Sequence, residues 1–189
     1  MFEVGDKVVH PAHGAGIVAG IEDKALVAEF THYYVIQLAA TDMKLMIPVQ
    51  TASEIGLRPV ARPAQVERIY ATLQSAARDL INDFKKRQSI LTEQLKSGDI
   101  LDVAEVVRDL FWRNEESPLS PTESRQLESA RQQLASELSL AEDIAVEESL
   151  AKIDMFLQRS VAMQQQAPAN PAAIDLVEPG SVGQAAAGD

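Results

Sequence analysis

The 189-residue sequence contains no cysteine, which excludes a disulfide framework, a thiolate metal site and a cysteine nucleophile. Aromatic residues are few, at 5% of the chain, and there is a single tryptophan, Trp112. No uninterrupted apolar run approaches the roughly 18 to 20 residues that a membrane span needs. The first residues lack the basic stretch and the apolar core of a signal peptide. We therefore expect a soluble, cytoplasmic protein without membrane contact.

An excess of basic charge is also absent, because the formal net charge is -11. The charge is unevenly distributed: residues 136–189 carry 2 basic and 9 acidic side chains, whereas residues 61–135 carry 11 basic and 12 acidic ones. A near-neutral middle can still present a local basic face, and the candidate is the run Lys85, Lys86 and Arg87. Such a surface neutralises few phosphates and binds DNA weakly by itself, so we expect a partner to supply additional affinity.

Residues 1–60 have the pattern of a small β-structure. Short apolar or alternating runs predict strands near residues 7–10, 14–21, 33–38 and 45–48, with glycines at the bends. Several short strands with glycine kinks are typical of a small SH3-like or Tudor-like barrel. Tyr33 and Tyr34 are expected to point to opposite faces, one into the core and one toward a partner strand.

Helical periodicity replaces this pattern after two prolines within residues 55–65. Apolar residues spaced by three and four predict one or two helices from Ala64 to Lys96, and Ser97-Gly98-Asp99 ends this region and caps the next helix. The run Ser120-Pro-Thr-Glu123 is a capping box that begins another helix, and a last helix is expected over residues 145–163. The prediction is an α+β chain of two domains: the barrel (1–60), a bundle of four to five helices (61–163) and a disordered acidic tail (164–189).

The single tryptophan lies in a predicted helix whose apolar stripe includes Val103, Val106, Val107 and Leu110. At about 100° per residue, Trp112 instead projects toward Glu105, Arg108 and Asp109, which is a charged face. An exposed indole between arginines suits stacking on a base or wedging into a base step. The alternative is that a neighbouring element covers it, and helical phase alone does not decide between the two.

No arrangement of residues indicates catalysis. His10 and His13 could be two metal ligands, but no further ligand pattern completes a site, and a polar turn between strands is the favoured interpretation. No serine has the context of a nucleophile elbow. Most carboxylates fall at solvated helical positions, so we assign no acid/base pair. We therefore expect no enzyme activity, no metal and no cofactor.

Taken together, the two halves resemble the CarD family of bacterial transcription regulators. Residues 4–18, 21–22 and 34–48 are similar to the RNA-polymerase-interacting domain, a Tudor-like fold shared with transcription-repair coupling factors. Residues 95–99, 103–110, 119–120 and 127–138 resemble the family's helical DNA-binding domain. The resemblance covers roughly residues 1–160, and the joint occurrence of both blocks makes it specific.

The resemblance implies a non-enzymatic regulator that docks its barrel on the β subunit of RNA polymerase and sets its helices against promoter DNA. An aromatic wedge then enters the minor groove at the upstream edge of the melted bubble and slows its collapse. The resemblance locates this wedge within residues 110–113, and helical phase favours Trp112 over Phe111. The remaining expected DNA contacts are Arg108, Arg113, Lys85, Lys86 and Arg87.

The expected polymerase contacts are Lys24, Leu45, Met46, Ile47 and Pro48. The resemblance leads us to expect an arginine at the position of Met46. An apolar residue there changes the strength or the detail of the polymerase contact. Two other classes remain open: an adaptor on RNA polymerase without direct DNA contact, which the acidic total charge favours, and an RNA-binding barrel, which the few basic residues of the barrel disfavour. We expect the chain to act as a monomer.

Overall fold

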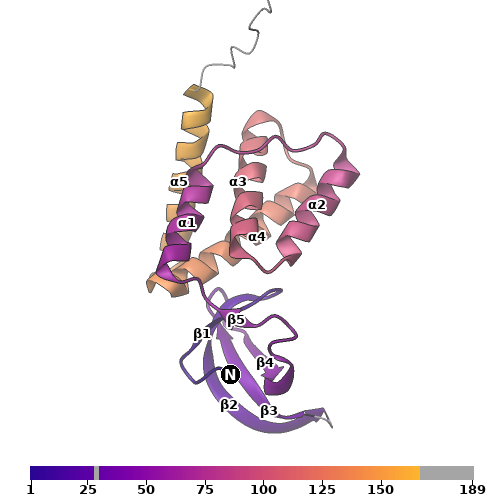
Figure 1. Cartoon of the computed structure of the whole chain (residues 1–189), viewed down its shortest axis with the longest axis vertical. Coiled ribbons are helices and arrows are strands. Elements are labelled where there is room, and N and C mark those ends of the chain that lie inside the picture. The colour runs from indigo at the N-terminus through magenta and orange to yellow at the C-terminus, as the bar shows by residue number, and fades with distance from the viewer. Residues whose placement is uncertain (28–29, 167–189) are drawn as a thin grey trace, which may run out of the picture.

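A computed structural model describes residues 1–27 and 30–166 of the chain (Figure 1). Its first part is a five-stranded antiparallel sheet in the order β4-β3-β2-β1-β5. The strands are β1 (Lys7–His10), β2 (Gly14–Val27), β3 (Phe30–Leu38), β4 (Lys44–Pro48) and β5 (Arg58–Pro59), with a 3-10 helix at Val49–Thr51. Five helices follow: α1 (Pro63–Gln74), α2 (Phe84–Lys96), α3 (Ile100–Glu116), α4 (Pro121–Glu142) and α5 (Val146–Gln166). The predicted α+β class, a Tudor-like barrel followed by a helical bundle, is confirmed.

The barrel closes around side chains from alternate positions of its long strands. Its core contains Val8, Val18, Tyr34, Ile36, Ile47, Ala52 and Leu57. A Cβ at Gly16 would lie 2.5 Å from the carbonyl oxygen of Gln37, so only glycine permits β2 to approach β3 this closely. His10 and His13 flank the turn between β1 and β2, as the favoured interpretation predicted.

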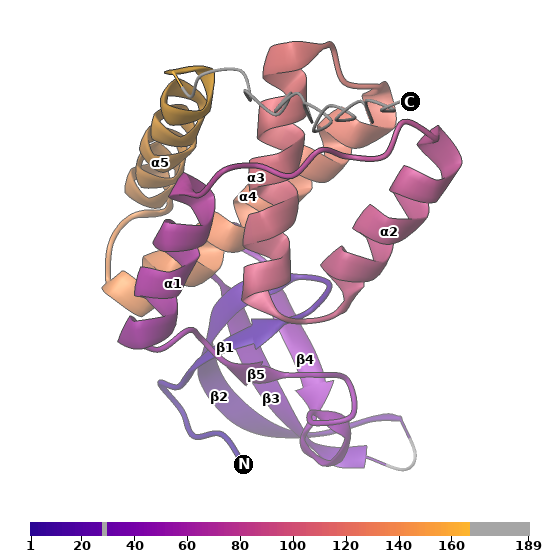
Figure 2. The same ribbon diagram turned by 45° about the horizontal axis from the view of Figure 1, so that its top comes forward.

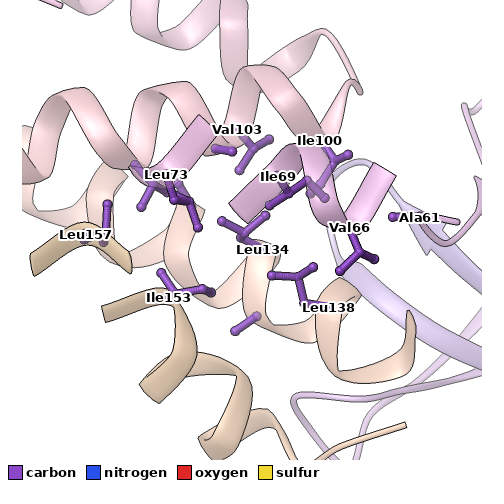
Figure 3. Close-up of a cluster of buried hydrophobic side chains, with 14 residues drawn as sticks. Ala61, Val66, Ile69, Leu73, Ile100, Val103, Leu134, Leu138, Ile153 and Leu157 are labelled. Atoms are coloured by element: carbon purple, nitrogen blue, oxygen red, sulfur yellow. The ribbon is translucent and has the colours of Figure 1, made fainter. Parts of the chain in front are cut away.

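The helical domain is built around α3, whose predicted apolar stripe is fully buried. The main core joins α1, α3, α4 and α5, and Figure 3 shows these side chains meeting between the four helices. The predicted helix starts are confirmed: Asp99 caps α3, and Ser120 with Glu123 forms the capping box of α4. No described helix combines the length and hydropathy needed to cross a membrane.

The predicted helical pattern from Ala64 to Lys96 divides into two helices joined by a non-helical connection, residues 75–83. The backbone of this connection is held by side chains from three helices. The Ala77 N–H donates to Oε1 of Gln164 at 2.9 Å, and the Arg78 N–H donates to Oδ1 of Asp109 at 3.1 Å. Arg87 donates to the carbonyl oxygens of Ile81 and Asn82. These side-chain bonds pair backbone groups that would bond to one another in a helix, which is the structure that the apolar spacing alone favoured.

The end of the last helix differs slightly from the prediction. Helix α5 continues to Gln166, so residues 164–166 of the predicted tail are helical. The rest of that predicted tail, residues 167–189, lies outside the described residues.

Candidate polymerase and nucleic-acid interfaces

Two of the predicted polymerase contacts lie side by side on the outer face of the barrel. Nζ of Lys24 is 3.8 Å from Sδ of Met46, although the two residues belong to the different strands β2 and β4. Nζ of Lys24 also forms an ion pair with Glu22 at 2.8 Å. The charge of Lys24 is therefore partly neutralised by Glu22, and the neighbouring side chain of Met46 is apolar.

The other residues of β4 alternate between the two faces of the sheet, as expected for a strand. Ile47 is 5% exposed and belongs to the barrel core, and Leu45 packs against the same cluster. The side chain of Ile47 therefore points inward, so any contact that this residue makes with a partner is through its backbone. Pro48 shares the outer face with Met46 and is half-buried.

The two tyrosines of β3 are both buried. Tyr34 lies in the barrel core, and its hydroxyl accepts a hydrogen bond from the Phe2 N–H at 2.9 Å. Tyr33 is 3% exposed, and its hydroxyl has no hydrogen-bond partner among the described residues. Tyr33 therefore does not present the open aromatic surface that was expected for a partner strand.

The charged face of α3 is an internal ion-pair network and not a solvent face. Arg108 and Asp109 are 6% and 1% exposed, and Nε of Arg108 donates to Oδ1 of Asp109 at 2.8 Å. Arg108 also donates to Oγ of Ser75 at 2.7 Å, while Arg78 pairs with both Asp109 and Glu105. Burial lowers the pKa of Arg78, but these two carboxylates outweigh it and raise the pKa above its ordinary value.

Arg108, an expected phosphate contact, is therefore already paired inside the protein, because helical phase identifies a face but not what covers it. The connection 75–83 lies over this face and supplies Ser75 and Arg78. Trp112 is half-buried at its edge, and its indole Nε1 is buried without a hydrogen-bond partner among the described residues. The partial burial of Trp112 agrees better with the alternative of a covered side chain than with an indole exposed to solvent.

A different aromatic residue is open to solvent. Phe84 is 46% exposed, and it is the only exposed Phe, Tyr or Trp among the described residues. It is the first residue of α2, which Asp83 caps by accepting a hydrogen bond from the Lys86 N–H. Ile81 and Ile90 are also exposed, at 41% and 46%, and line a cavity of about 180 Å³ together with Leu80 and Leu91.

Sequence reasoning missed Phe84 because its spacing from Leu80 and Ile81 fits an apolar helical stripe. The signal that could have found it is the sequence Asn82-Asp83 directly before it, since an Asp is a preferred N-cap and places the next residue at a helix start.

The basic cluster divides into two exposed residues and one buried residue. Lys85 and Lys86 are exposed, whereas Arg87 is 4% exposed and its Nε donates to Oε1 of Glu123 at 2.7 Å. The Arg87 guanidinium also lies 5.8 Å from the ring centroid of Phe84. Arg87 is thus not the solvent-exposed cation that the sequence predicted, and it supports the aromatic ring from within the domain.

Glu123 joins three helices at this end of the domain. Besides Arg87 of α2, its carboxylate lies 3.7 Å from Nε of Arg113, the quarter-exposed arginine of α3. Burial raises the pKa of Glu123, but hydrogen bonds from Ser120 and the charge of Arg87 outweigh it and hold the pKa below its ordinary value. Among the described residues no cluster of three or more His, Asp or Glu side chains is placed to hold a metal ion.

The start of α2, whose first residue is Phe84, lies at the end of the helical domain that is remote from the barrel (Figures 1 and 2). The opposite end of α2 lies next to the barrel, because Nε of Arg58 in β5 donates to the carbonyl oxygen of Gly98 at 3.0 Å. The 13 residues of α2 separate the two ends by about 20 Å, at the rise of an α-helix.

Comparison with known proteins assigns a family to both domains. Residues 2–61 match the model of the CarD-like/TRCF RID domain, and residues 68–154 match the model of the CarD C-terminal domain. The chain is also 37% identical over 144 residues to a Bacillus subtilis protein named "Putative transcription factor YdeB", an alignment covering 76% of this chain and 94% of that protein. The chain therefore belongs to the CarD family of transcription factors and carries that family's RNA-polymerase-interacting domain at its amino-terminal end.

Proposed function

We propose that this protein binds the β subunit of RNA polymerase through the outer face of its barrel and stabilises the open promoter complex. The helical domain would contact DNA at the upstream edge of the transcription bubble, and the protein would act as a non-enzymatic cytoplasmic monomer. The polymerase contact is supported by the family match of residues 2–61. The observation that carries the DNA contact is the exposed Phe84 between apolar and basic neighbours.

We assign the aromatic wedge to Phe84 and not to Trp112. A wedge must leave the protein surface and enter a base step, which requires an exposed ring on a firm support. Phe84 is exposed at a capped helix start, and the buried pair of Arg87 and Glu123 lies directly beneath it. Trp112 is half-buried, so its insertion into DNA would first require exposure of a covered side chain.

The cations around Phe84 are suited to phosphate contact. Lys85 and Lys86 are exposed and have no ion-pair partner in the part of the chain that the structure describes. Arg125 is also exposed and lies in the amino-terminal part of α4, where Glu123 ties α4 to α2 and α3. Three phosphate contacts give weak, salt-dependent binding, so tethering to polymerase would supply the effective concentration that the contact needs.

The proposed wedge stabilises the open state of the promoter more than the closed state. Unstacking a base step costs on the order of a few kcal/mol in a closed duplex, whereas the edge of an open bubble already has an unpaired neighbour. A side chain that binds only the open state shifts the equilibrium by its differential affinity. The result is slower collapse of the bubble.

The test compares Phe84→Ala with Trp112→Phe in measurements of open-complex lifetime. Removing the Phe84 ring takes away stacking of about 1–3 kcal/mol, so we expect the lifetime to fall by roughly one order of magnitude. Trp112→Phe keeps a large apolar side chain and should leave the lifetime close to that of the unchanged protein. Binding to the isolated β-lobe should be equal in all three proteins.

An unchanged lifetime for Phe84→Ala would overturn the wedge assignment, and a loss confined to Trp112→Phe would return it to Trp112.

The second candidate function is an adaptor on polymerase without DNA contact. The net charge of -11 and the burial of Arg87 and Arg108 favour it. Footprinting on a promoter complex separates the two, because an adaptor adds no protection at the upstream fork.

A further inference from the structure

The joint between the barrel and the helices is organised by one buried carboxylate. Glu137 of α4 is 0% exposed and accepts hydrogen bonds from both terminal nitrogens of Arg58, at 2.7 and 2.9 Å. The same carboxylate accepts the Ala61 N–H at 2.9 Å. Arg58 belongs to the last strand of the barrel, and Ala61 lies in the short segment that leads into α1. Glu137 therefore holds both the barrel and the exit of the chain from it.

Arg58 extends this connection to a third element. Its Nε donates to the carbonyl oxygen of Gly98, in the turn that follows α2. The guanidinium thus donates its two terminal nitrogens to Glu137 and its Nε–H to Gly98. Because α2 carries Phe84 at its other end, the arginine links the barrel to the helix that bears the exposed aromatic.

A second ion pair, between Lys7 of β1 and Asp143 at the end of α4, also joins the two domains, and part of the joint is made of small residues in close contact. The Ala15 N–H donates to Oγ of Ser136 at 3.3 Å, and a Cβ at Gly14 would lie 3.0 Å from the same oxygen. Ser136 and Ser139 are buried, at 2% and 3% exposure. Ala15 is also buried, at 1%, although it is not part of the barrel core. The backbone of the barrel therefore packs directly on α4. Only short side chains separate the two at this point, so the barrel cannot slide along α4 without breaking these contacts.

An intact ion pair with a buried member adds little net stability, whereas the loss of one partner leaves an uncompensated buried charge and is strongly unfavourable. Burying a carboxylate is unfavourable unless all its partners are in place, and the partners of Glu137 come from the barrel and from the segment that leaves it. Domains joined by a short linker otherwise move relative to each other by default. Any rotation of the barrel would leave the Glu137 charge buried and unpaired, so the pair selects a single orientation.

We infer that Glu137 and Arg58 are positioning residues that hold the polymerase-binding barrel and the Phe84 end of the helical domain in one fixed orientation. The chain then works as a rigid arm whose reach is set before it meets DNA. A loose joint would leave polymerase binding intact but lower the effective concentration of Phe84 at the fork. The inference rests on the proposed function for its effect on DNA, but the rigidity itself does not.

The experiment uses the full chain and the variant Glu137→Gln, which keeps the shape of the side chain and removes its charge. The matched control is Glu142→Gln on the same helix, because Glu142 pairs with Tyr70 and Lys152 inside the helical domain. The chain has no cysteine, so Met43→Cys in the barrel and Met155→Cys in α5 give two unique spin-label sites, both exposed. The distance distribution between the labels reports the joint directly.

We expect Glu137→Gln to broaden the interdomain distance distribution and to shorten the open-complex lifetime by at least about threefold, as a loss of effective concentration predicts. Binding to the isolated β-lobe should stay unchanged, and Glu142→Gln should change neither quantity. Arg58→Lys keeps the charge but loses the fork, and should broaden the distribution in the same way. It serves as the second variant if Glu137→Gln fails to fold.

A distribution that stays narrow in both variants would overturn the inference, and so would a broadened distribution with an unchanged lifetime while Phe84→Ala shortens it. If Phe84→Ala has no effect, the proposed DNA contact fails, and the distance distributions still decide whether the joint is rigid.

Discussion

At the scale of single residues, the structure redistributes the roles of the predicted arginines. Arg87 and Arg108 were expected to contact phosphates, yet each is buried and paired with a carboxylate. Composition and helical phase place a charge on a face but do not reveal which element will cover that face. The partner of Arg87 is Glu123, 36 positions along the chain, so the pair depends on tertiary packing that no local pattern encodes.

Glu123 provides a prediction on stability. Glu123→Gln breaks the buried pair with Arg87 and should lower the free energy of unfolding at pH 7 by about 3–5 kcal/mol. Because the folded pKa of Glu123 lies below its ordinary value of 4.5, its stabilisation is present above that pH and is lost as the pH falls through the folded pKa. The difference between the two proteins should therefore shrink on acidification, as urea unfolding at a series of pH values can measure.

The control for this prediction is Glu128→Gln, because Glu128 lies on the same helix with an exposed side chain. Its effect should stay within about 0.5 kcal/mol, the usual range for surface positions. A difference between Glu123→Gln and the unchanged protein that is constant from neutral to acid pH would contradict the assigned pKa.

At the scale of secondary-structure elements, the starts of α3 and α4 were predictable and the connection 75–83 was not. Asp99 and Ser120 are local capping signals that act through the next three residues, so they work without tertiary context. Leu80 and Ile81 continue the apolar spacing of a helix, but the backbone there is held by Asp109 and Arg87 from other helices. The predicted barrel strands were likewise readable from alternation, whereas the two-residue strand β5 is defined only by its pairing with β1.

The start of α2 provides a prediction at this scale. Asp83→Ala removes the cap that accepts the Lys86 N–H, costs about 1 kcal/mol of helix stability and frays the turn that carries Phe84. Asp83→Asn removes the same charge but keeps a capping oxygen. We expect Asp83→Ala to shorten the open-complex lifetime more than Asp83→Asn. Equal lifetimes for the two variants would show that the order of this turn does not matter for the DNA contact.

At the scale of the whole molecule, the acidic balance opposes the proposed contact with DNA. Residues 167–189 contribute three acidic side chains, Asp175, Glu178 and Asp189, and no basic one. Their repulsion of phosphates acts at a distance and is screened by salt, with a Debye length of about 8 Å at physiological ionic strength. The family match and the contacts of Glu137 with Arg58 and Ala61 concern residues before this segment, so the segment can be altered without changing either.

A chain ending at Gln166 should therefore bind promoter DNA more tightly at low salt, with the gain vanishing as the salt concentration rises. The matched control keeps the full length and replaces the three acidic residues by their amides, and it should reproduce the gain. A truncated chain that gains affinity while the neutralised chain does not would show that length, and not charge, is responsible. Fluorescence anisotropy across a salt series measures both.

The connection 75–83 has one further consequence. The amide hydrogens of Ala77 and Arg78 are donated to the side chains of Gln164 and Asp109, which belong to α5 and α3. Such hydrogens exchange with deuterium only when the side chain of Gln164 or Asp109 moves away from the amide that it accepts. These amides should therefore exchange slowly although their residues have no regular secondary structure, and the Arg78 amide should exchange more slowly than the Ala77 amide, because its acceptor Asp109 is 1% exposed.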